Sequence, residues 1–218
     1  MKSAKMVRIL AIILLGLTAV MTLLGGTGTS CAAFSPEKYE MFELIPYQWL
    51  YQVLVITTTA ASLVGFWATY AFLRGRKHAY RGTVAFLVVG LVLGGIQMAA
   101  SLNLRGKAAP TNMRVTLTAF TLLVFLLLRL PGIWTKVNQA GKSEGPGTAA
   151  GLTLFLGGLL TLTTPVWAGP THMLNGSNLV FVFQGPLLIG GSLMTLIGIV
   201  LWLRPRSNLR PVLADSKG

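Results

Sequence analysis

The sequence predicts an all-α protein, a polytopic transmembrane helical bundle of about six spans with both termini in the cytoplasm. Six apolar runs follow one another along the chain, and each is close to the roughly 20 residues that a helix needs to cross the hydrocarbon core. Charged residues make up only 11% of the 218 residues, whereas soluble proteins usually carry about 25%. The Lys and Arg residues gather in short segments between the apolar runs.

The expected spans cover approximately residues 9–26, 49–73, 84–104, 115–130, 148–168 and 179–203. Inside lipid every backbone amide needs a partner within its own segment, so we expect these runs to be helices. We therefore expect a single transmembrane helical domain over residues 1–203. A basic cytoplasmic tail over residues 204–218 should follow it.

The first run allows a second interpretation. It follows basic residues and precedes small ones, which is also the pattern of a secretory signal peptide. The run is longer than the roughly 7–15 residues of a typical signal-peptide core. We favour a retained helix, and cleavage stays an open alternative.

The basic residues predict the orientation. Fourteen of the 18 Lys and Arg residues fall in the segments that would share one membrane face, and that face should be cytoplasmic. Arg105, Lys107 and Arg114 depart from this pattern, because they lie in an outer link. They either contact lipid headgroups or an acidic partner, or are tolerated because the remaining bias is larger, which we favour. The formal net charge of +13 is then explained by membrane topology, with lipid and not nucleic acid as the partner.

The link between the first two runs predicts a short helix in the membrane interface. Ser35 can cap this helix, and Pro36 suits its first position. Tyr39, Phe42 and Ile45 follow at helical spacing and would form its apolar face. We favour an interfacial anchor over a lid that binds a ligand.

Two glutamines fall within expected spans, Gln97 in the third and Gln184 in the sixth. An amide inside lipid prefers a partner, and a hydrogen bond between helices contributes about 0.6–2 kcal/mol. The pair either holds the two helices together or lines a polar cavity. We favour the first, because no charged residue accompanies the glutamines within the spans.

Small residues recur at four-residue spacing and predict close helix packing. Gly90 with Gly94, and Gly191 with Thr195, are examples. Such faces let helix backbones approach one another, within one chain or between two.

Residue types that carry chemistry are scarce. Cys31 is the only cysteine, and His78 and His172 are expected on opposite membrane faces, so we do not expect a haem held by both. Arg129, close to the end of the fourth run, is the nearest candidate for an intramembrane charge, and we expect it to extend to the interface. We predict no catalytic residue, no metal site and no cofactor.

The leading functional hypothesis is an accessory or structural subunit that packs with other membrane protein subunits in a larger complex. It rests on abundant packing glycines and scarce chemical groups. The alternative is a small transporter or channel for a neutral or apolar solute. An enzyme or cofactor protein ranks third.

Overall fold

The computed structural model describes residues 2–137 and 147–204, which form helices almost throughout. The α-helices are α1 (Lys2–Gly28), α2 (Ser30–Phe34), α3 (Gln48–Leu73), α4 (Ala79–Arg105), α5 (Thr111–Leu128), α7 (Gly147–Leu162), α8 (Thr164–Trp167) and α9 (Gln184–Leu203). The 3-10 helices are η1 (Glu37–Tyr39), η2 (Phe42–Tyr47), η3 (Gly169–Thr171) and η4 (Leu179–Phe183). A two-residue hairpin pairs β1 (Met173–Leu174) with β2 (Ser177–Asn178).

The predicted all-α class is confirmed. Among the described residues, five helical segments are long and apolar enough to cross a membrane, as expected of a multi-pass membrane protein. The sixth apolar helix, α7, has 16 residues and is shorter than the others. The predicted tail lies outside the described residues, apart from Arg204.

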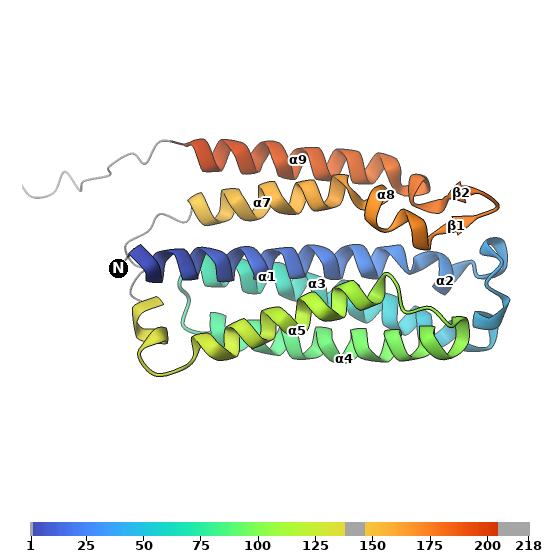
Figure 1. Ribbon diagram of the computed structural model, residues 1–218, viewed down its shortest axis with the longest axis horizontal. Coiled ribbons are helices and arrows are strands. Elements are labelled where there is room, and N and C mark those ends of the chain that lie inside the picture. Colours follow the sequence, from blue (N-terminus) through green and yellow to red (C-terminus); the bar gives the residue numbers. More distant parts are fainter. Residues whose placement is uncertain (1, 138–146, 205–218) are drawn as a thin grey trace, which may run out of the picture.

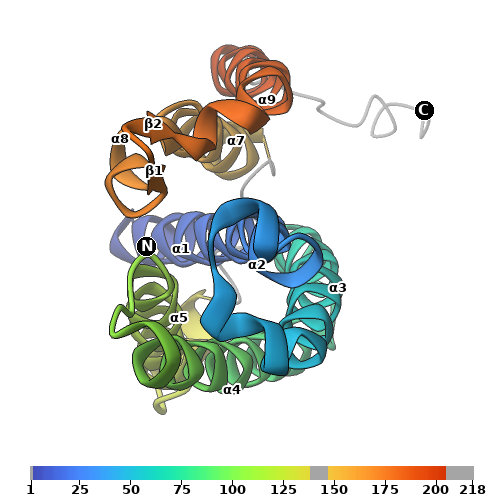
Figure 2. The same ribbon diagram turned by 90° about the vertical axis from the view of Figure 1, so that its right-hand side faces the viewer.

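Helices α1, α3, α4 and α5 form a four-helix bundle in which each helix contacts the next and α5 closes the ring against α1 (Figures 1 and 2). Helix α7 packs on α1 from outside this bundle, and α9 packs on α7. Successive long helices run antiparallel, so the start of α1 and the end of α9 lie at the same end of the molecule (Figure 1). We call this the N-terminal end, and the opposite end, which carries β1 and β2, the hairpin end.

Apolar side chains hold the bundle together towards the N-terminal end. Ile12 and Leu15 of α1 are almost completely buried, as are Phe86 of α4 and Phe125 of α5. Phe125 also meets Phe72 of α3 edge to face, with ring centroids 5.3 Å apart. Side chains from all four helices therefore share one core.

Arg8 ties α1 to α3 at the same end. Its side chain is buried, and Nη2 donates to the carbonyl oxygens of Phe72 at 2.6 Å and of Leu73 at 3.3 Å. A cation at the C-terminal end of a helix interacts favourably with the carbonyl groups that the helix leaves without partners. Arg8, one of the basic residues of the predicted cytoplasmic face, thus also has a packing role.

Glycines bring α7 and α9 into backbone contact. A Cβ atom on Gly151 would lie 2.6 Å from the backbone nitrogen of Trp202, and one on Gly158 would lie 2.7 Å from the carbonyl oxygen of Gly191. Larger side chains at these positions would force the helices apart. The predicted packing residue Gly191 therefore lies in a tight helix interface within this chain.

The other predicted packing glycines, Gly90 and Gly94, face α5. A Cβ atom on Gly94 would lie 2.8 Å from Cγ2 of Val115, and one on Gly90 would be in ordinary contact with Thr118 at 3.6 Å. Close packing is thus required at Gly94 and looser at Gly90.

Three expected boundaries differ in the structure. The expected helix over 148–168 breaks after Leu162 and restarts as α8, in which Pro165 lies in the first turn. Proline donates no backbone hydrogen bond and clashes with the preceding turn, so a continuous helix is disfavoured there. The expected span over 179–203 starts as the 3-10 helix η4, and α5 begins at Thr111, so it includes Arg114.

The predicted single interfacial helix is wrong in its form. The segment folds as η1 and η2, because Glu40 between them adopts a left-handed backbone with φ 54°. Tyr39 ends η1, whereas Phe42 and Ile45 belong to η2 and are exposed.

Candidate functional site

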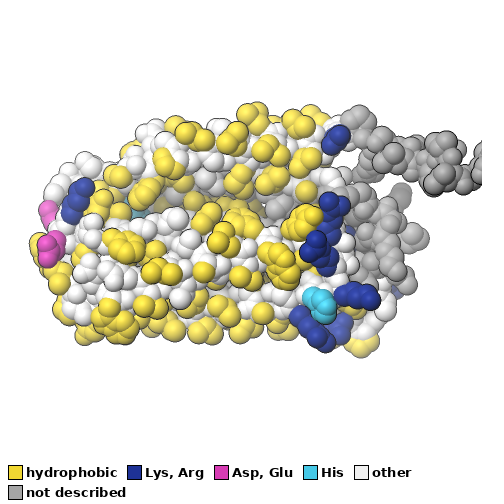
Figure 3. All heavy atoms as spheres, turned by 180° about the vertical axis from the view of Figure 1, so that it is seen from behind, with side chains coloured by type: hydrophobic (Ala, Val, Ile, Leu, Met, Phe, Trp, Pro, Cys, Tyr) yellow, Lys and Arg dark blue, Asp and Glu magenta, His cyan; other side chains and the backbone are white. Residues whose placement is uncertain are grey.

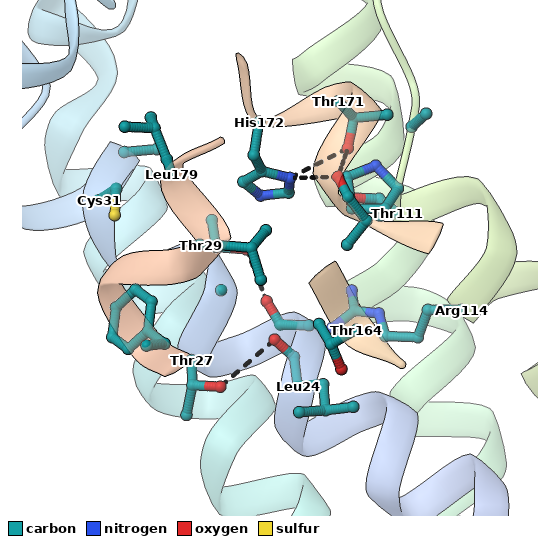
Figure 4. Close-up of a pocket in the computed structure, with 18 of the residues that line it drawn as sticks. Leu24, Thr27, Thr29, Cys31, Thr111, Arg114, Thr164, Thr171, His172 and Leu179 are labelled. Carbon is teal, nitrogen blue, oxygen red and sulfur yellow. Dashed lines mark hydrogen bonds between the residues drawn. The ribbon is translucent and has the colours of Figure 1, made fainter. Parts of the chain in front are cut away.

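A cavity of about 730 Å³ opens at the hairpin end, between the four-helix bundle and the α7–α9 pair. Figure 4 shows part of its lining, and Figure 3 shows a furrow between the α7–α9 pair and the bundle. Cavities that hold small molecules typically measure about 300–1,000 Å³. This cavity is therefore large enough for a ligand.

Most of the cavity wall is apolar. Helix α1 contributes Val20 and Leu24, α9 contributes Leu187 and Met194, and α8 contributes Trp167. These side chains come from the four-helix bundle and from the segments that follow it. The shape of the cavity therefore depends on how α7 and α9 are placed against α1.

Arg114 is the charged group inside this wall. It lies in the first turns of α5, is only 3% exposed, and points into the cavity (Figure 4). Its Nη2 donates to Oε1 of Gln97 on α4 at 2.8 Å, and Nε2 of Gln97 donates to Oγ1 of Thr29 at 2.8 Å. Thr29 in turn donates to the carbonyl oxygen of Gly25 at 2.6 Å. The network joins α5, α4 and the end of α1.

The network leaves much of the guanidinium unsatisfied. Nε and Nη1 of Arg114 are buried and have no hydrogen-bond partner in the described part of the chain. No carboxylate in that part lies within 4.0 Å of this side chain. Gly25 and Gly94 give it space, because a Cβ atom on Gly25 would lie 3.0 Å from its Cδ and one on Gly94 3.3 Å from its Nη2.

The rim of the cavity carries charges of both signs. Arg105 and Lys107 come from the end of α4 and the link that follows, and Glu40 and Glu43 from the segment after α2. Both glutamates are exposed, and Oε1 of Glu40 accepts a hydrogen bond from Nδ2 of Asn175 at 3.2 Å.

His172 adds a titratable ring to the upper wall (Figure 4). Its Nδ1 lies 2.9 Å from the carbonyl oxygen of Ala168 and 3.0 Å from Oγ1 of Thr171. A protonated Nδ1 donates to Ala168, which leaves Nε2 for another partner. Tyr39 also lines the cavity, and hydrogen bonding to the Cys31 side chain raises the pKa of its phenol.

Comparison with known proteins gives no relative: no family model, no curated protein and no solved structure matches this chain.

Of the residues singled out in the sequence, Gln97 lies at the centre of the site, Gly94 lies beneath Arg114, and Tyr39 is in the wall. Gln184 is exposed at the first residue of α9, and the partners of Gln97 are Thr29 and Arg114 instead. The expected contact between the two glutamines is therefore absent from the described residues.

The residue that sequence reasoning missed is Arg114. The sequence predicts an outer link at this position, whereas the structure buries Arg114 in α5. Pro110 is the sequence feature that could have shown this, because proline suits the start of a helix. A fourth helix that begins beside Pro110 includes Arg114. Arg129, the expected intramembrane candidate, is exposed at the other end of α5, over the rings of Tyr80 and Trp134.

The network predicts a non-additive effect on stability. We expect Gln97→Leu to lower the free energy of unfolding by about 1–3 kcal/mol, because it removes a partner of a buried cation. The double variant Gln97→Leu with Arg114→Leu should be more stable than Gln97→Leu alone, because no charge is left buried without a partner. Thermal unfolding of the purified variants in detergent measures both effects.

Asn103→Leu is the matched control, because Asn103 is exposed on the same helix, and this change should have little effect. A double variant that is no more stable than Gln97→Leu alone would contradict this explanation.

Proposed function

We propose that this protein is a membrane-embedded binding protein for a lipid-like molecule, which it holds in the cavity at the hairpin end. The observation that carries the proposal is the cavity itself, a largely apolar space of about 730 Å³ with one buried arginine in its wall. An apolar pocket with a few convergent polar groups is the usual form of a small-molecule site. Binding needs no reactive group, which agrees with the scarcity of such groups in the sequence.

The alternative function, a small transporter or channel for a neutral or apolar solute, would use the same cavity as the site where the solute binds first. An accessory subunit remains the second candidate, favoured by the position of α9. This helix contacts the rest of the protein mainly through α7, and it exposes a row of large apolar side chains to its surroundings. A second polypeptide in a stoichiometric amount after purification in mild detergent would support this candidate, and a lone chain would count against it.

We further propose six membrane crossings in a cell membrane, with both termini on the cytoplasmic side. Helix α7 packs between α1 and α9, which are each long enough to span. With α8 it covers residues 147–167, about 30 Å of helix at 1.5 Å per residue, close to the hydrocarbon thickness. Lys and Arg gather at the N-terminal end (Figure 3), as expected if that end is cytoplasmic.

Cysteine accessibility tests this topology. In a Cys31→Ser background, we expect Lys38→Cys and Asn175→Cys to react with a membrane-impermeant maleimide in intact cells, because both native side chains are exposed at the hairpin end. His78→Cys, exposed at the N-terminal end, should react only after the cells are permeabilised. Labelling of His78→Cys but not of Asn175→Cys in intact cells would show the reverse orientation. If only one of Lys38→Cys and Asn175→Cys were labelled in intact cells, the two sites would lie on different sides of the membrane, and six crossings would be excluded.

Filling the cavity tests the binding function. Gly28 lines the cavity, and a Cβ atom added there meets no atom within 4 Å, so Gly28→Phe should occupy space without displacing the backbone. We expect it to weaken binding of dibrominated C18 amphiphiles by about tenfold or more, a change of about 1.4 kcal/mol or more. Quenching of Trp167 fluorescence by bromine, measured as the difference between the native protein and Trp167→Phe, reports binding.

Gly95→Phe is the control, because Gly95 also has open space around its Cβ position but does not line the cavity. Equal quenching of native protein, Gly28→Phe and Gly95→Phe would show that the bromine atoms reach the tryptophan from bulk detergent, and the binding function would be abandoned.

A further inference from the structure

We infer that the molecule held in the cavity is an anionic amphiphile, whose carboxylate or phosphate head binds Arg114 while its hydrocarbon chain lies along the apolar wall. This inference rests on the proposed binding function and adds the chemical class of the ligand. It follows from three properties of the site: a cation without a counter-charge in the described residues, unpartnered donors on a side chain that lines the cavity, and an apolar surface beside them.

The cation has no counter-charge in the described part of the chain. Arg114 is only 3% exposed, yet its side chain donates to an uncharged amide, Gln97, and contacts no carboxylate in the described residues. Burying an ion without a partner costs several kcal/mol, so buried charges are normally paired. The two glutamates of the rim, Glu40 and Glu43, are exposed and do not reach it. An anion that enters the cavity would supply the missing charge.

The donors fit an oxyanion. A guanidinium carries five N–H groups, and Nε and Nη1, which have no partner in the described residues, hold three of them. A planar guanidinium binds the oxygens of carboxylates and phosphates with charge-assisted hydrogen bonds. Gln97 holds Nη2 from the other side at 2.8 Å, so the group is already oriented before the ligand arrives.

The apolar wall explains why a small free anion would be a poor ligand. Val20 and Leu24 of α1 face the same cavity as Leu187 and Met194 of α9. A hydrocarbon chain that covers these side chains removes apolar area from water at roughly 25 cal/mol per Å². The head group therefore supplies the specificity, and the chain supplies much of the affinity.

Matched amphiphiles test this inference. The purified full chain in an uncharged detergent is titrated with dibromostearate, with dibromostearyl phosphate, and with dibromostearyl alcohol as the neutral reference, all with one C18 chain. We expect at least one of the two anions to bind about 10–100-fold more tightly than the alcohol, because hydrogen bonds to a charged group contribute about 1.5–3 kcal/mol. The comparison of the two anions tells carboxylate from phosphate, and sodium acetate or inorganic phosphate alone should not compete at millimolar concentration.

Variants assign the preference to Arg114. Arg114→Gln should remove the preference for the anion, measured as the ratio of the two affinities, and Arg114→Lys should keep part of it. Arg105→Gln, a change at the half-buried rim position, should keep most of the preference. Where Arg114→Gln does not fold, the ratio measured on the native protein still decides whether the ligand is anionic, and Arg114→Lys compared with Arg105→Gln assigns the preference.

The outcomes separate the two proposals. Equal affinity of the native protein for the anions and the alcohol, with both lost in Gly28→Phe, would overturn the anionic ligand and keep the binding function. A preference that persists unchanged in Arg114→Gln would also overturn the role of Arg114. Binding of none of the three amphiphiles would overturn both proposals together.

Discussion

The hydrogen bond from Arg114 to Gln97 is the interaction on which the hairpin end of this protein depends. It joins α5 to α4, and through Thr29 it reaches the end of α1, so three helices of the bundle meet at one buried cation. A single amide cannot neutralise a guanidinium, which leaves part of the cost of burial uncompensated in the described residues. Intramembrane charges of this kind are rare and are usually functional.

Glycines provide the space for this arrangement in two different ways. Gly25 and Gly94 lie where a side chain would press on Arg114, so they let a long side chain lie flat between helices. Gly151 and Gly158 instead bring the backbone of α7 against that of α9. The second contact makes the α7–α9 pair a unit of its own, and the cavity lies where this unit meets the bundle.

The class of the fold and the positions of the long helices could be predicted from the sequence, because the membrane demands long uncharged helices and leaves few alternatives. Details that depend on tertiary contacts could not. The sequence predicts that the fourth run begins at Val115, because a charge normally ends an apolar segment. The burial of Arg114 instead depends on Gln97 and on glycines of two other helices. Likewise Gln184 resembles Gln97 in hydropathy, but it lies at the exposed start of α9.

The most direct test is an experimental density map of the native protein, purified in mild detergent, at a resolution that shows side chains at the hairpin end. We expect elongated density that no protein atom explains, with its head within about 3 Å of Nε or Nη1 of Arg114. Its remainder should follow α1 and α9. A guanidinium whose donors all end on oxygen atoms of the protein, in an otherwise empty cavity, would contradict the account.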